Sequence, residues 1–138
     1  MKNSYTLPLE ELSNLTQEVL DKFPEGVIIL RGDLAAGKTT LVKAFAKALG
    51  CVDDVTSPTF SLQQCYGENI FHYDIYNHGL EHFLSLGMLE ELEKDGLHFI
   101  EWGDDALVEL LESAGMDVMT IDIKKISDKA REYSICIH

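Results

Sequence analysis

The residues best placed to do chemistry lie in segment 32–40, which reads Gly-Asp-Leu-Ala-Ala-Gly-Lys-Thr-Thr. It matches the phosphate-binding loop pattern, in which Gly and four residues of any type precede Gly-Lys and then Ser or Thr. The backbone N–H groups of such a loop point inward around an anion, and the following helix adds its positive end. Lys38 is expected to reach the β- and γ-phosphates of a nucleotide, and the Thr39 hydroxyl is expected to bind Mg²⁺. The predicted nucleotide-binding residues are Asp33, Leu34, Ala35, Ala36, Gly37, Lys38, Thr39 and Thr40.

Two acidic residues are candidates for the rest of the site. Asp74 follows the apolar run 70–73, and Glu101 follows the apolar run 97–100. Enzymes with this loop need an acid near Mg²⁺, usually at the end of a strand. One carboxylate with Thr39 and phosphate oxygens suits Mg²⁺, and the other acid is free to orient the attacking water. The spacing leaves open which acid contacts the metal, and each taken alone could be an ordinary acid in solvent.

The loop requires a strand before it and a helix after it. Residues 27–30 form a short β-branched apolar run typical of a buried parallel strand, and residues 41–49 have apolar side chains at helical spacing. Other helices are predicted at 9–23, at 80–94 with a break near Gly87, and at 106–113 with Asp104 or Asp105 as the cap. Other strands are predicted at 61–66, 70–76, 97–100, 116–126 and 131–137, with residues 51–60 as a loop. These elements predict an α/β fold, a P-loop NTPase-like three-layer sandwich with a mixed central sheet.

Composition limits the class of protein. The 138 residues predict one domain, residues 1–138, and the 46% hydrophobic content is enough for a core. No apolar run approaches the roughly 20 residues of a membrane span, and no apolar signal region follows the N-terminus. Three unevenly spaced cysteines favour free thiols in a reducing compartment, so we expect a cytoplasmic protein. The net charge of −13 disfavours direct binding to a nucleic acid backbone.

Four segments in order resemble the TsaE (YjeE) family of bacterial ATPases. They are residues 32–40, Thr-Ser-Pro-Thr-Phe at 56–60, His-Tyr-Asp-Ile-Tyr at 72–76 and Ile-Glu-Trp at 100–102. The resemblance implies an ATPase that acts with TsaB- and TsaD-like proteins in tRNA threonylcarbamoyladenosine (t⁶A) biosynthesis. Its cofactors would be ATP or ADP and Mg²⁺, and it would meet tRNA only through the complex.

The resemblance also implies roles for individual residues. Thr39 and Glu101 would bind Mg²⁺, Asp74 would take the second acidic role, and Trp102 would lie beside the site. Segment 57–60 would sense the nucleotide, and segment 8–10 with Lys129 or Arg131 would approach the adenine. Two positions depart from the family pattern: Ala35 replaces a usual glycine, and Asn77 replaces a frequent arginine.

Four other classes of protein share some of these features. A small-molecule or nucleoside kinase uses the same loop, but Arg31 and Arg131 are the only arginines and neither lies in a lid-like insertion. A zinc protein is suggested by His78-Gly-Leu-Glu-His82, which matches the inverted zincin pattern, although Gly79 disfavours a helix there. A nucleotide-binding module with little activity of its own is close to the main interpretation. A GTPase is disfavoured because no Asn-Lys-x-Asp segment is present.

Overall fold

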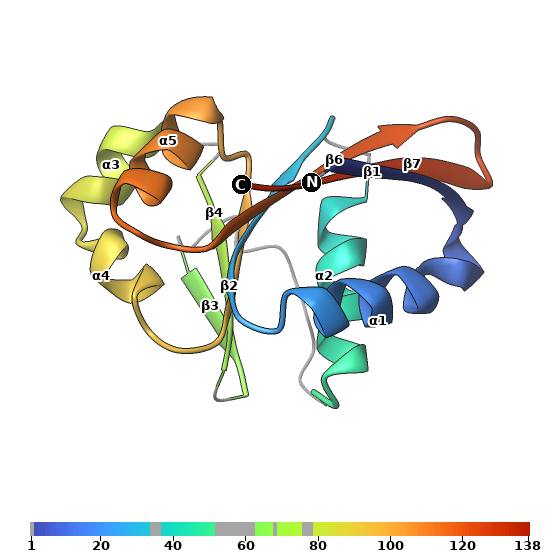
Figure 1. Cartoon of the computed structure of the whole chain (residues 1–138), viewed down its shortest axis with the longest axis horizontal. Helices are drawn as coiled ribbons and strands as arrows, with labels where there is room; N and C mark the ends of the chain where they lie inside the picture. Colours follow the sequence, from blue (N-terminus) through green and yellow to red (C-terminus); the bar gives the residue numbers. More distant parts are fainter. Residues whose placement is uncertain (1, 34–36, 52–62, 68, 76–78) are drawn as a thin grey trace.

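The computed structural model describes residues 2–33, 37–51, 63–67, 69–75 and 79–138, and its centre is one mixed β-sheet (Figure 1). The described part of the sheet has seven strands in the order β1-β7-β6-β2-β5-β4-β3. The strands are β1 (Lys2–Pro8), β2 (Gly26–Arg31), β3 (Gln63–Tyr66), β4 (Ile70–Asp74), β5 (Leu97–Glu101), β6 (Val118–Lys125) and β7 (Ala130–Ile137).

The parallel part of the sheet positions the site. β2 pairs in parallel with β5 and β6, and β5 pairs in parallel with β4. The other pairings, β1 with β7, β6 with β7 and β3 with β4, are antiparallel. Since the parallel strands end on the same side of the sheet, Gly32 and Asp33 after β2 lie at the same end as the last residues of β4 and β5. The register places Asp74 opposite Glu101 at that edge.

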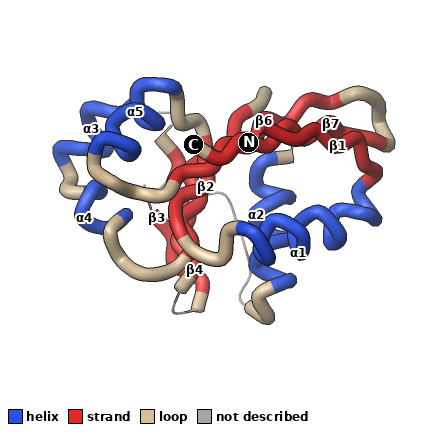
Figure 2. Tube along the Cα trace, viewed as in Figure 1, coloured by secondary structure: helices blue, strands red, loops and turns tan. Residues whose placement is uncertain are grey.

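Helices cover both faces of the sheet, which confirms the expected three layers (Figure 2). The helices on one face are α1 (Leu12–Lys22) and α2 (Lys38–Ala48), and those on the other are α3 (Gly79–Ser85), α4 (Met88–Leu92) and α5 (Asp105–Ser113). A short 3₁₀ helix, η1 (Leu9–Glu11), precedes α1. Each face buries its own hydrophobic cluster, with Phe45 and Phe99 in one and Phe83 and Leu107 in the other.

Local signals in the sequence correctly predict the break between α3 and α4 and the start of α5. Gly87, with a φ of 76°, separates α3 from α4 at the predicted break. Asp104, rather than Asp105, is the N-cap of α5, because its side chain accepts a hydrogen bond of 3.0 Å from the Leu107 N–H. Segment 51–60, expected to be a loop, lies almost wholly outside the described residues.

One strand is an addition to the predicted elements. β1 contains only two large apolar residues in alternation, Tyr5 and Leu7, and it is held at the sheet edge by its pairing with β7. Within the described ranges, no helix combines the length and apolar character needed to cross a membrane.

Candidate functional site

The predicted phosphate-binding loop joins the end of β2 to the start of α2. Its two glycines have positive φ angles, 150° at Gly32 and 105° at Gly37, which a side chain would disfavour. Gly37 is also the N-cap of α2, so the first turn of that helix faces the loop. Leu34, Ala35 and Ala36, which were expected to contribute amides, lie outside the described residues.

Lys38 is folded back onto this loop. Its ammonium group donates hydrogen bonds of 2.8 Å to the carbonyl oxygens of Gly32 and Asp33, and the residue is only 3% exposed. The Nζ atom also lies 3.9 Å from the centre of the Trp102 ring, a cation–π contact. Burial lowers the pKa of Lys38, and the carboxylates of Glu101, Asp74 and Asp33 oppose that shift. The ammonium is thus held where its charge is weakly screened.

The two predicted Mg²⁺ ligands contact each other. The Thr39 hydroxyl, in the first turn of α2, donates a hydrogen bond of 3.1 Å to Glu101 Oε2 at the end of β5. Glu101 is 3% exposed, which excludes an ordinary strand-end acid in solvent. A hydroxyl and a carboxylate are the hard oxygen donors that Mg²⁺ prefers, so these residues fit the metal.

Asp74 and Thr40 are neighbours of this pair, Asp74 opposite Glu101 in the sheet and Thr40 next to Thr39 in α2. Asp74 is half-buried on β4 opposite Glu101, and its charge acts on Lys38. Thr40 is exposed in the first turn of α2, as is Asp33 before it. The structure therefore gathers Lys38, Thr39, Asp74 and Glu101 at one sheet edge.

Trp102 has an unusual backbone. Its φ is 72°, a left-handed conformation that costs a non-glycine residue roughly 1–3 kcal/mol. The Trp102 N–H donates to the Leu30 carbonyl over 3.1 Å, and a Cβ on the next residue, Gly103, would lie 2.7 Å from Ile29. This tight turn directs the indole from the end of β5 onto Lys38.

A comparison with known families identifies this arrangement. A family model described as "Threonylcarbamoyl adenosine biosynthesis protein TsaE" matches residues 8–133, which is most of the chain. The chain belongs to the TsaE family.

Individual TsaE proteins are similar over most of the chain. The protein named "tRNA threonylcarbamoyladenosine biosynthesis protein TsaE" in Treponema pallidum is 38% identical over 112 residues, covering 79% of this chain and 80% of that protein. Its namesake in Bacillus subtilis is 37% identical over 112 residues, covering 79% and 68%. The crystal structure of Bacillus subtilis YdiB superposes with a TM-score of 0.69 at 28% identity, covering 98% of this chain and 84% of that one.

Several expectations from the family resemblance fall on other parts of the chain. The proposed sensing segment 57–60, Asn77 and His78 lie outside the described residues. On β7 the Arg131 Nε atom lies 3.9 Å from the position that a Cβ would take on Gly37, so this cation approaches the loop. Pro8 pairs with Ala130 at the start of the same strand. Contact of these residues with an adenine stays a prediction.

His72 is the residue that sequence reasoning missed in this TsaE protein. Its side chain is fully buried on β4, and its Nε2 atom lies 2.5 Å from Glu101 Oε2. The available signal was a histidine inside an otherwise apolar strand, two residues before Asp74 and therefore on the same face of the sheet.

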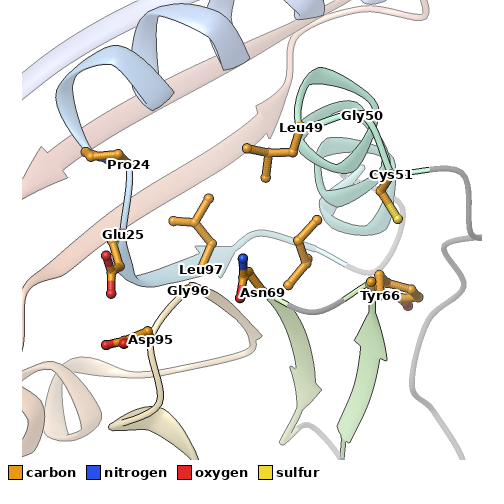
Figure 3. A pocket seen from close by; sticks show the side chains of 12 residues that line it. Pro24, Glu25, Leu49, Gly50, Cys51, Tyr66, Asn69, Asp95, Gly96 and Leu97 are labelled. Carbon is orange, nitrogen blue, oxygen red and sulfur yellow. The ribbon is translucent and has the colours of Figure 1, made fainter.

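A cavity lies away from the phosphate loop (Figure 3). It has a volume of about 430 Å³, and it is lined by residues from the end of α2, the β3–β4 turn and the segments that precede β2 and β5. Leu49, Tyr66 and Leu97 supply apolar walls, and Glu25 and Asp95 supply carboxylates. Because the cavity lies where the parallel strands begin, it is at the opposite end of these strands from Lys38 and Glu101 and is separate from the candidate site.

Proposed function

We propose that this chain is the ATP-binding and ATP-hydrolysing component of the bacterial t⁶A modification machinery. Membership of the TsaE family supports the role in t⁶A biosynthesis, since the relatives are named for that process. The observation that carries the nucleotide chemistry is the joining of Lys38, Thr39 and Glu101 at the end of a glycine loop. The relatives also favour this role over the kinase alternative.

In this proposal the phosphates enter the loop and the chain's own groups change partners. Lys38 exchanges the carbonyls of Gly32 and Asp33 for β- and γ-phosphate oxygens, which form stronger charge-assisted bonds. The loop amides and the start of α2 hold the same phosphates. Thr39 and Glu101 would hold Mg²⁺, which when bound neutralises charge that develops on the phosphates.

Asp74 completes the proposed site. It lies opposite Glu101 at the same sheet edge, where a carboxylate can orient a water molecule toward the γ-phosphate and accept its proton. Turnover by the isolated chain is expected to be slow, with activation by TsaD- and TsaB-like partners. The chain would meet tRNA through that complex.

Binding of ATP by a Lys38→Ala variant tests the nucleotide site. One hydrogen bond to a charged group contributes about 1.5–3 kcal/mol, so the variant should bind ATP about 10–100-fold more weakly in equilibrium dialysis. Lys43→Ala is the matched control, because Lys43 is exposed on the same helix. If Lys38→Ala and Lys43→Ala both bind ATP as tightly as the parent, the proposed role of the loop is wrong.

Hydrolysis with and without partners tests the biological role. Purified TsaB- and TsaD-like proteins from the same organism should raise the ATP turnover of the parent chain and should leave Lys38→Ala inactive. Formation of t⁶A in a tRNA transcript is measured in the same reactions. Efficient tRNA modification with Lys38→Ala would separate this chain from the proposed function.

A further inference from the structure

The side chain of His72 links the candidate metal site to a tyrosine on the next strand. Its Nε2 atom lies 2.5 Å from Glu101 Oε2, and its Nδ1 atom lies 3.2 Å from the Tyr66 hydroxyl oxygen. His72 is 0% exposed, Glu101 is 3% exposed and Tyr66 is 4% exposed. Both ring nitrogens of His72 therefore have protein partners in a region that water hardly reaches.

The bond from His72 restricts the Glu101 carboxylate. A glutamate has three rotatable bonds, so the strand fixes its backbone but not the direction of its oxygens. Oε2 lies within hydrogen-bond distance of both His72 on β4 and Thr39 on α2. A carboxylate that binds Mg²⁺ is ionised and can only accept, so Mg²⁺ binding by Glu101 would require the His72 Nε2 atom to donate in this bond. The two donors together determine where this oxygen lies.

Strand register accounts for the contact. Asp74 is opposite Glu101, so His72 is one diagonal step away on the same face of the sheet. Gln64 is opposite His72 on β3, and its side-chain oxygen lies 2.6 Å from the Tyr66 hydroxyl. A chain of contacts thus runs from β3 through β4 to β5 and α2.

We propose that His72, supported by Tyr66, is a positioning residue that holds the Glu101 carboxylate against Thr39 for Mg²⁺ binding. This inference rests on the proposed function and assigns a role to a residue behind the metal ligands. Groups that orient a metal ligand through a hydrogen bond typically change metal affinity or activity 10–100-fold when they are removed.

A second buried histidine provides a matched comparison. His98 on β5 is 1% exposed; the Tyr73 hydroxyl lies 2.8 Å from its Nδ1, and the Lys94 carbonyl lies 2.7 Å from its Nε2. It belongs to the opposite face of the sheet, where Phe71 stacks on its ring at 4.4 Å between centroids. His72 and His98 therefore share burial and a tyrosine partner, and only His72 contacts a candidate metal ligand.

Four proteins test the proposal: the parent chain, His72→Phe, His72→Gln and His98→Phe. Binding of ADP is followed by fluorescence of Trp102, the single tryptophan, which lies beside Lys38. The quantity compared is the ratio of the ADP dissociation constant in EDTA to that in Mg²⁺. This ratio should fall about tenfold or more in His72→Phe, recover in His72→Gln because its amide can donate to Glu101, and stay at the parent value in His98→Phe.

The outcomes separate this inference from the proposed function. If the parent chain binds no nucleotide, the proposed function fails and the inference fails with it. If the parent responds to Mg²⁺ and His72→Phe responds equally, only the inference is overturned. An equal loss in His72→Phe and His98→Phe would also overturn it, because burial alone would then explain the effect.

Circular dichroism first checks that each variant folds. Should His72→Phe fail to fold, Tyr66→Phe replaces it, because this change deletes one hydroxyl oxygen, with Tyr73→Phe as its control. The Mg²⁺ ratio should fall in Tyr66→Phe and stay at the parent value in Tyr73→Phe. An unchanged ratio in Tyr66→Phe would then overturn the proposal.

Discussion

Lys38 carries a charge into a position that is 97% shielded from solvent, since only 3% of the residue is exposed. Two carbonyl oxygens and an indole face compensate the lost water. Neutral carbonyls are weaker partners for an ammonium than phosphate oxygens are, so the proposed nucleotide would displace them. The buried lysine would then exchange two neutral partners for an anion.

Asp74→Asn separates catalysis from binding at the residue scale. The change preserves the size of the side chain and removes the negative charge that would accept a proton from water. With partner proteins present, hydrolysis in a single turnover should fall by about 10²–10⁴-fold. ATP affinity from equilibrium dialysis should hold, because Asp74 is not among the expected phosphate ligands. A joint loss of affinity and thermal stability would instead identify Asp74 as structural.

His98 predicts a dependence of stability on pH. Burial lowers the pKa of His98, while its bond to the Lys94 carbonyl and the charge of Glu91 oppose that shift. In the unfolded chain, His98 becomes protonated as the pH falls below about 6.5. In the folded chain, His98 becomes protonated only at a lower pH. The free energy of unfolding should therefore decrease as pH falls through about 6.5.

His98→Phe isolates that contribution. Urea unfolding curves at neutral and mildly acidic pH should show a smaller loss of stability in the variant than in the parent, whatever its stability at neutral pH. The carboxylates titrate in both proteins, so they cancel in the comparison. Parallel loss of stability in the two proteins would mean that His98 is not the group responsible.

At the scale of elements, β2 and α2, which flank the glycine loop, could be predicted from the sequence, and the edge strand β1 could not. β2 and α2 have strong apolar patterns that flank a glycine loop, so both their type and their place were predictable. β1 has too few apolar residues to indicate a strand. It is a strand because it pairs with β7, which is distant in the sequence, and a local pattern cannot show that pairing. The His72–Glu101 contact was likewise hidden, since it depends on the register between β4 and β5.

Gly96 shows how closely these strands must fit. Its φ is 128°, and a Cβ there would lie 2.4 Å from the Asn69 carbonyl oxygen, which accepts the Leu97 N–H of β5. Gly96→Ala should destabilise the fold by about 3 kcal/mol, because backbone strain and a backbone clash combine. It should also weaken nucleotide binding, since β5 carries Glu101 at its other end.

Gly115→Ala is the control for that substitution. Gly115 also has a positive φ, 80°, but a Cβ there would meet nothing within 4 Å, so a cost of about 1 kcal/mol is expected. Chemical denaturation of both variants gives the difference directly. Equal destabilisation would show that backbone conformation alone, and not the approach of Asn69, requires glycine at position 96.

On the scale of the whole molecule, the net charge opposes the nucleotide that we propose for the site. The chain has 24 acidic and 11 basic residues, and its net charge is −13. In the proposed site a triphosphate would be attracted by Lys38 and a bound cation, and acidic side chains more than about one Debye length away would be screened at physiological salt. Local geometry rather than the overall field would then select the nucleotide.

The same charge predicts that this chain does not bind tRNA by itself. Non-specific affinity for nucleic acid comes from Lys and Arg side chains that release counterions from phosphates, and it is strongest at low salt. The β6–β7 hairpin carries four basic residues, Lys124, Lys125, Lys129 and Arg131, and Lys125 already forms an ion pair of 3.5 Å with Asp128. A gel-shift titration of tRNA at roughly 50 mM salt should therefore show no complex with the chain alone at concentrations up to about 10 μM, within the range where basic proteins bind non-specifically.

Adding the TsaB- and TsaD-like proteins should produce a complex that contains this chain. A shift by the chain alone that strengthens as salt is lowered would contradict this prediction and would assign tRNA contact to the hairpin, which Lys124→Glu combined with Lys129→Glu should then abolish.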